Sequence, residues 1–163
     1  MADTTIRFFC DETDMALGKG LATLRADVVH PGHPDLPEVP TGAKDPDWIP
    51  IIGTKRMLVI TRDKNMRKRP GEGLAWRRGE LRGFVLTGGG QQDTWASVRV
   101  LARWWDEMEK IADERPAGPW MYAVTEDRRP REMDLPRREP AEQGHQHPST
   151  STVVMVRNPK TSL

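Results

Sequence analysis

One stretch of the chain, Asp47 to Lys64, constrains the fold more than any other. It reads DWIPIIGTKRMLVITRDK, and its second half, Arg56 to Thr61, is dominated by apolar and β-branched residues. This composition is typical of a strand buried on both faces in a parallel sheet. The charged residues that follow this strand should therefore lie at the carboxyl edge of the sheet, where open α/β folds bind their ligands.

The beginning of the same stretch predicts a helix. Asp47 stands directly before a Trp-Ile-Pro sequence, and an acidic residue followed by proline within one turn favours a helix start. A right-handed crossover begins its helix at the carboxyl edge of the sheet and returns the next strand to that edge. Asp47 and Asp63 are therefore expected on one rim, with Asp45 as a close rival of Asp47.

The rest of the chain predicts an alternation of strands and helices. The expected strands are Thr5–Cys10, Asp27–Val29, Gly83–Thr87 and Pro119–Val124. The first expected helix has an apolar face of Leu17, Leu21 and Leu24, and the helix after the third strand covers Gly71–Arg78. The last expected helix covers Thr94–Glu114, with Thr94 as its cap and a buried stripe that includes Trp95. We predict an α/β fold whose mostly parallel sheet has four to five strands, with strands one and three as neighbours.

Composition separates a folded part from a tail. The chain has 163 residues, of which 36% are hydrophobic and 30% charged. We expect one domain over residues 1–125 and a disordered charged tail over residues 126–163, where proline and charge leave few apolar groups to bury. No apolar run reaches the about 20 residues that cross a bilayer, so we expect a soluble, cytoplasmic protein with no membrane partner.

Acidic residues follow the ends of two predicted strands that should be neighbours. Asp11 and Glu12 follow the first strand and Asp63 follows the third, so that these acids and Asp47 should face one crevice. Like charges held close together are costly unless they are protonated or neutralised by a cation. Carboxylates without His or Cys partners favour Mg²⁺ or Mn²⁺. Caps and turns are the alternative role of such acids.

A basic run adjoins these acids. The residues we expect to contact nucleic-acid phosphates are Arg62, Lys64, Arg67, Lys68 and Arg69. A solvated helix face is the alternative interpretation of the same run. Trp76 lies farther along it as either a base-stacking or a structural residue, and Cys10 is expected to be a buried thiol.

The acidic pattern carries a family resemblance. A strand ending in Asp11 and Glu12, then Asp47 opening a helix, then LVITRDK with Asp63, resembles the PIN-like domains, in particular the short branch related to VapC-type toxins. The resemblance covers roughly residues 6–124. It implies a three-layer PIN-like fold and a Mg²⁺- or Mn²⁺-dependent endoribonuclease.

The resemblance also implies roles for single residues. Asp11, Asp47 and Asp63 match the acids that hold the ion activating water, Glu12 is usual beside the first of them, and Thr61 matches the position whose hydroxyl supports the site. Fuller PIN domains carry another acid on a helix before the Asp47 position, and the sequence shows no convincing counterpart.

Three functional hypotheses follow. The first is an endoribonuclease that acts on RNA, as the toxin of a toxin–antitoxin pair. Its further expected partners are an antitoxin protein and a second copy of the chain in a homodimer. The second is a receiver-like signalling module with Asp63 as phosphoacceptor and Thr87 after the next strand, although a lysine after a fifth strand is lacking. The third is a non-catalytic RNA- or protein-binding module on a PIN-like scaffold.

Overall fold

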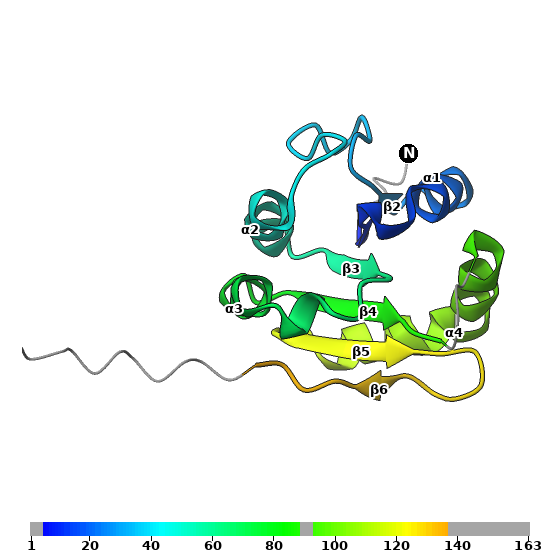
Figure 1. Ribbon diagram of the computed structural model, residues 1–163. Coiled ribbons are helices and arrows are strands. Elements are labelled where there is room, and N and C mark those ends of the chain that lie inside the picture. The colour runs from blue at the N-terminus through cyan, green and yellow to red at the C-terminus, as the bar shows by residue number, and fades with distance from the viewer. Residues whose placement is uncertain (1–4, 89–92, 137–163) are drawn as a thin grey trace, which may run out of the picture.

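Short apolar runs form a single twisted sheet. The computed structural model describes residues 5–88 and 93–136 (Figure 1). The strands are β1 (Phe8–Cys10), β2 (Val28–Val29), β3 (Leu58–Thr61), β4 (Arg82–Leu86), β5 (Trp120–Val124) and β6 (Arg131–Glu132). They lie in the order β2-β1-β3-β4-β5-β6; the first five are parallel and β6 is antiparallel to β5. The predicted α/β class and the pairing of strands one and three are confirmed.

Helices cover both faces of this sheet. The longer helices are α1 (Met15–Leu24), α2 (Asp45–Lys55), α3 (Pro70–Arg78) and α4 (Thr94–Glu114), and the short 3-10 helices are η1 (Glu12–Asp14) and η2 (Met66–Lys68). Figure 1 shows α1 and α4 on one side of the sheet and α2 and α3 on the other. None of the described helices combines the length and the apolar character needed to span a membrane.

Alternation along the strands builds two cores. Successive side chains of a strand point to opposite faces, so Phe8 and Phe84 pack with α1 and α4, while Phe9 and Val85 pack with α2 and α3. Both faces are sealed from solvent, as parallel sheets require. The carboxyl edge of the sheet is then the place where polar side chains can gather.

The sheet is larger than predicted. We expected four to five strands and a disordered tail after about residue 126, but β6 extends the described fold to residue 136. The Met133 N–H donates to the Met121 carbonyl at 2.8 Å, and Met133 and Leu135 pack against the α2 and α3 core. These apolar side chains anchor an otherwise charged segment. The prediction for residues 137–163 lies outside the described residues.

Two details of the predicted helices are wrong. Leu24 is 78% exposed and Trp95 is 66% exposed, so neither belongs to the core. Trp95 precedes the buried Ser97 by two residues, which places it about 200° away around α4. The cap of α4 is Asp93, which accepts a hydrogen bond from the Ala96 N–H at 2.7 Å, and not Thr94.

Candidate metal centre

The carboxyl ends of β1 and β3 bring Asp11 and Thr61 together. These strands pair in parallel with Cys10 opposite Ile60, so the residues that follow emerge side by side. Asp11 is only 3% exposed. One of its carboxylate oxygens accepts the Thr61 hydroxyl at 2.7 Å, and the other accepts the Thr13 N–H at 3.2 Å and the Thr13 hydroxyl. The local backbone and two threonines therefore fix this carboxylate.

Asp11 is held without a cation. Burial raises the pKa of Asp11 from 3.8 to about 6, and the hydrogen bonds from Thr13 and Thr61 oppose that rise. Among the described residues no ion pair involves Asp11. A cation at its edge would favour the charged form of this carboxylate. The neighbouring Cys10 thiol is buried, and burial raises its pKa well above the ordinary value, so it is a poor metal ligand.

A second set of carboxylates comes from three elements. Asp45 starts α2, Asp63 follows β3, and Glu72 lies in the first turn of α3. Their oxygens all lie within 4.8 Å of one another, as metal ligands would. Asp45 also accepts the indole N–H of the buried Trp48 at 2.9 Å, which fixes its position on the helix start.

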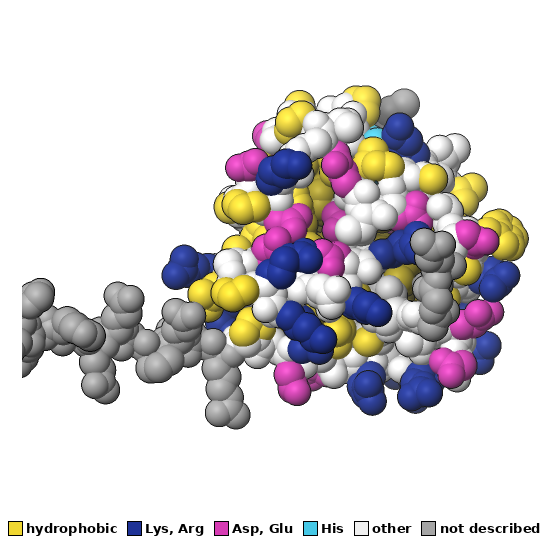
Figure 2. Space-filling model, in the orientation of Figure 1, with side chains coloured by type: hydrophobic (Ala, Val, Ile, Leu, Met, Phe, Trp, Pro, Cys, Tyr) yellow, Lys and Arg dark blue, Asp and Glu magenta, His cyan; other side chains and the backbone are white. Residues whose placement is uncertain are grey.

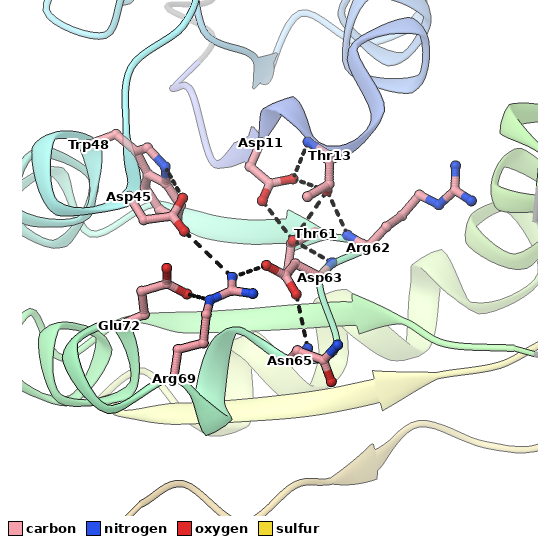
Figure 3. Close-up of polar contacts among 10 residues, drawn as sticks. All are labelled: Asp11, Thr13, Asp45, Trp48, Thr61, Arg62, Asp63, Asn65, Arg69 and Glu72. Carbon is pink, nitrogen blue, oxygen red and sulfur yellow. Dashed lines mark hydrogen bonds and ion pairs between the residues drawn. The ribbon is translucent and has the colours of Figure 1, made fainter. Parts of the chain in front are cut away.

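One arginine balances this second set. The Arg69 guanidinium donates to Asp63 and to Glu72, and it lies 3.9 Å from an oxygen of Asp45 (Figure 3). Hydrogen bonds to Asp63 and Glu72 raise the pKa of Arg69 above its ordinary value. Three carboxylates thus share one organic cation. A metal ion that binds there must take the place of the guanidinium.

All these acids open on one pocket. It has a volume of about 360 Å³, and the acids that line it are Asp11, Glu12, Asp45, Asp63 and Glu72. Figure 2 shows acidic side chains gathered over the same region of the surface. The described residues that line the pocket include neither histidine nor cysteine. This all-oxygen set fits Mg²⁺ or Mn²⁺.

Comparison with known families agrees with this site. A family model described as "PIN like domain" matches residues 6–88, just over half of the chain. The chain belongs to the PIN-like domain family. PIN-like domains are typically nucleases that use divalent metals, and the acidic cluster of this chain is a group of carboxylates that could hold such an ion. No curated protein and no solved structure matches the chain.

The structure separates the two rival aspartates of this PIN-like domain. The helix begins at Asp45 with Pro46 next, so Asp45 enters the pocket, whereas Asp47 is exposed and does not line it. Glu12 lies at the rim, where it accepts the Gly42 N–H. Glu72 was not recognised in the sequence. Its signal was Pro70, which starts α3 and places an acid in the first turn.

The predicted phosphate-binding residues divide into three groups. Arg62 pairs with Asp14 at 2.9 Å, and Arg67 donates to the Asp134 carbonyl at 3.0 Å. Arg69 pairs with Asp63 and Glu72, two of the acids that line the pocket. Lys64 and Lys68 are exposed, and they make no ion pair with described residues. The nucleic-acid role weighed for Trp76 is wrong, because its ring is 0% exposed and its indole N–H donates to the Trp120 carbonyl.

Proposed function

We propose that this PIN-like domain is a Mg²⁺- or Mn²⁺-dependent endoribonuclease that hydrolyses RNA phosphodiester bonds. The observation that carries the proposal is the convergence of five acids from four segments of the chain on one open pocket. Acids that only cap helices or form turns have no need to meet in this way. The resemblance to VapC-type toxins points to RNA as the substrate.

We assign the ligand role to Asp11, Asp45, Asp63 and Glu72, with Glu12 at the rim. Between the two rivals, Asp45 is preferred because it lines the pocket and Asp47 does not. A divalent ion held by these residues would supply a bound water of lowered pKa and positive charge beside a phosphoryl oxygen. Carboxylates supply that ion with hard oxygen ligands and keep it at the carboxyl edge of the sheet.

Thr61 acts as a positioning residue for two of these acids. Its hydroxyl donates to Asp11 at 2.7 Å and accepts the Asp63 N–H at 3.0 Å. One side chain therefore fixes the spacing between the carboxylate that follows β1 and the carboxylate that follows β3. A bound ion would displace the Arg69 guanidinium from these acids, and the guanidinium would then be available to donate to a substrate phosphate.

Cleavage of a panel of single-stranded and structured RNAs tests the proposal. Wild type is assayed with Mn²⁺ or Mg²⁺ and with EDTA, beside Asp11→Asn and Asp63→Asn. The cleavage rate of either variant should fall about 100-fold or more, because each loses several kcal/mol of transition-state stabilisation. Asp47→Asn is the matched control, since it removes the same charge from an exposed neighbour, and it should cleave like wild type.

Two results would overturn the assignment. Cleavage that persists in EDTA, or that is equal in wild type and Asp63→Asn, would belong to a contaminant or to another site. Calorimetric Mn²⁺ titration of the same proteins separates a lost ion from a lost substrate. Mn²⁺ binding without cleavage of any RNA would favour the non-catalytic binding module.

The other hypotheses gain no support from the described residues. The residue after β5 is Thr125, so the lysine of a receiver site is missing there too. Asp63 is ion-paired with Arg69, which would hinder its phosphorylation. The toxin role, an antitoxin partner and a homodimer are proposals that rest on the resemblance. Light scattering of the purified chain, alone and with the product of a neighbouring small gene, tests both assemblies.

A further inference from the structure

A second concave surface lies beside the acidic pocket. Two hollows, of about 460 and about 510 Å³, share Thr87, Ala123 and Arg131 as lining residues. Together they form one groove across the carboxyl ends of β4 and β5, which we call the strand-end groove. One wall is the segment 64–68 after β3, and the other is the connection 125–131 between β5 and β6 (Figure 1).

Exposed cations face this groove from both walls. Lys64 and Lys68 come from the first wall, and Arg129 and Arg131 come from the second. None of the four makes an ion pair within the part of the chain that the structure describes. Figure 2 shows basic side chains spread below the acidic patch, down to the β5–β6 connection. The groove therefore offers positive charge that no described acid neutralises.

Most acids that line the groove are paired. Glu132 lies 2.7 Å from Arg115, Glu126 lies 3.5 Å from Arg99, and Asp127 lies 3.6 Å from Arg128. The first two of these arginines do not line the groove. Asp134 is the lining acid without an ion pair among the described residues. Positive charge therefore prevails.

The groove begins next to the acidic pocket. Lys64 directly follows Asp63, and the Asn65 N–H donates to the Asp63 carboxylate at 2.9 Å (Figure 3). A chain of phosphates with one member at the acids could continue into the groove without a break. Resting on the proposed function, we infer that the strand-end groove holds the single-stranded RNA segment that leads away from the cleaved phosphate, with Arg129 and Arg131 as its outer phosphate contacts.

The shape and lining of the groove favour one strand over a duplex. Hollows of about 460 and about 510 Å³ offer room for part of one backbone, whereas proteins bind double-stranded RNA across two successive minor grooves, over a longer surface. Single-strand sites combine a basic groove along the backbone with stacking aromatic rings. No aromatic residue is among the described groove lining. Recognition should therefore depend on phosphates and depend little on base sequence.

The second wall is also a feature beyond the family match. The PIN-like match ends at residue 88, and the β5–β6 connection lies after it. The antiparallel pairing of Ala123 with Arg131 turns the connection back over the sheet edge. The substrate path we infer is thus built partly by a segment that the matched family region lacks.

Equilibrium binding tests the groove separately from catalysis. Binding of a labelled oligouridylate and of a duplex of equal length is measured by fluorescence anisotropy in EDTA, with Asp63→Asn as background. Adding Arg129→Gln and Arg131→Gln should weaken single-strand binding about 10-fold. The slope of the logarithm of the binding constant against the logarithm of salt concentration should become about 1.4 less steep, because each of the two lost phosphate contacts contributes about 0.7. Lys68→Gln, on the opposite wall, should weaken binding in the same direction.

A charge-matched control decides the outcome. Lys19→Gln with Lys110→Gln removes the same charge from exposed positions on α1 and α4. This control should bind like the background protein. Equal weakening in the groove variant and the control, or stronger binding of the duplex, would overturn the inference. Absence of metal-dependent cleavage in wild type would instead count against the proposed function, so the two failures are distinguishable.

Discussion

Two buried aspartates, three residues apart, differ in their partners: Asp14 is paired with an arginine, whereas Asp11 accepts hydrogen bonds from neutral donors. Asp14 accepts the Arg62 guanidinium at 2.9 Å, the Leu17 N–H at 3.0 Å and the Thr94 hydroxyl at 3.0 Å. Among the described residues, Asp11 accepts hydrogen bonds only from Thr13 and Thr61. Both residues are buried, with 3% of Asp11 and 8% of Asp14 exposed. Within this pair, the carboxylate with a resident cation joins elements together, whereas the one with neutral donors has no cation of the protein beside it among the described residues.

Adjacent residues at the end of β3 produce this difference. The Thr61 hydroxyl donates to Asp11, and the side chain of the next residue, Arg62, reaches Asp14. Successive side chains of an extended chain point to opposite sides. One strand end therefore delivers a hydroxyl toward the pocket and a guanidinium toward α4. The separation of roles follows from one step along the backbone.

The largest expected effect on stability is that of Asp14→Ala. It removes the cap of α1, worth about 1 kcal/mol, and it removes the carboxylate that pairs with the part-buried Arg62. We expect a loss on the order of 3 kcal/mol in the free energy of unfolding, measured by urea denaturation. Asp14→Asn keeps a capping oxygen and should lose less. Equal losses for the two variants would mean that the ion pair contributes little beyond the cap.

Asp11→Asn should raise the free energy of unfolding of the metal-free protein, whereas Asp14→Ala should lower it. The folded-state pKa of Asp11, about 6, lies above its ordinary value of 3.8, so the folded protein holds this proton more tightly. Wild type therefore loses stability as pH rises from about 4 to about 6, by about 3 kcal/mol at most. Asparagine carries no charge to bury. The variant should gain on wild type over this pH interval and keep that gain above it.

Urea denaturation in EDTA at pH 4, 6 and 8 measures this gain. Loss of hydrogen bonds to the carboxylate offsets part of it, so about 1 to 3 kcal/mol is expected at pH 8. Asp47→Asn is the control and should show no such pH-dependent gain, because Asp47 is exposed. A constant difference between Asp11→Asn and wild type at all three pH values would contradict the assignment.

The same contrast shows which parts of the site local sequence determines. Asp11 and Asp63 were predicted because each follows an apolar strand, and strand ends are visible in the sequence. The choice between Asp45 and Asp47 depends on which residue starts α2, a boundary that propensity places only within a few residues. Arg69 was predicted to bind phosphate because it belongs to a basic run. Its pairing with three acids could not be predicted, since it exists only after β3, α2 and α3 have packed together.

The fold shows a similar division. Parallel strands were expected from the alternation of strands and helices with a right-handed crossover, and the neighbouring of strands one and three was taken from the order of doubly wound sheets. The two-residue strand β6 has no periodicity to detect, and Met133 and Leu135 reveal their role only by packing on a core already formed. Trp95 was misplaced because the spacing of apolar residues does not define where a stripe ends.

A smaller effect is expected from Arg69→Gln. It removes the cation that pairs with Asp45, Asp63 and Glu72, so that these carboxylates lose their partner of opposite charge and come to resemble Asp11. Mn²⁺ no longer competes with a guanidinium, and its dissociation constant should fall about 10-fold, the equivalent of about 1.4 kcal/mol. Calorimetry measures this, with Arg78→Gln, at an exposed position at the end of α3, as control. Weaker Mn²⁺ binding in Arg69→Gln would show that the arginine supports the site instead of competing for it.

The smallest expected effect distinguishes a donor from a cation at Asp14. Thr94 donates its hydroxyl to both Asp14 oxygens, at 3.0 and 3.2 Å, and so joins the start of α4 to the start of α1. Thr94→Val keeps the shape of the side chain and removes the donor, which should cost about 1 kcal/mol because Arg62 still balances the charge. Thr94→Ser keeps the donor and should restore most of this loss. If Thr94→Val cost as much as Asp14→Ala, the hydroxyl and not the guanidinium would be what stabilises this carboxylate, and the contrast with Asp11 would disappear.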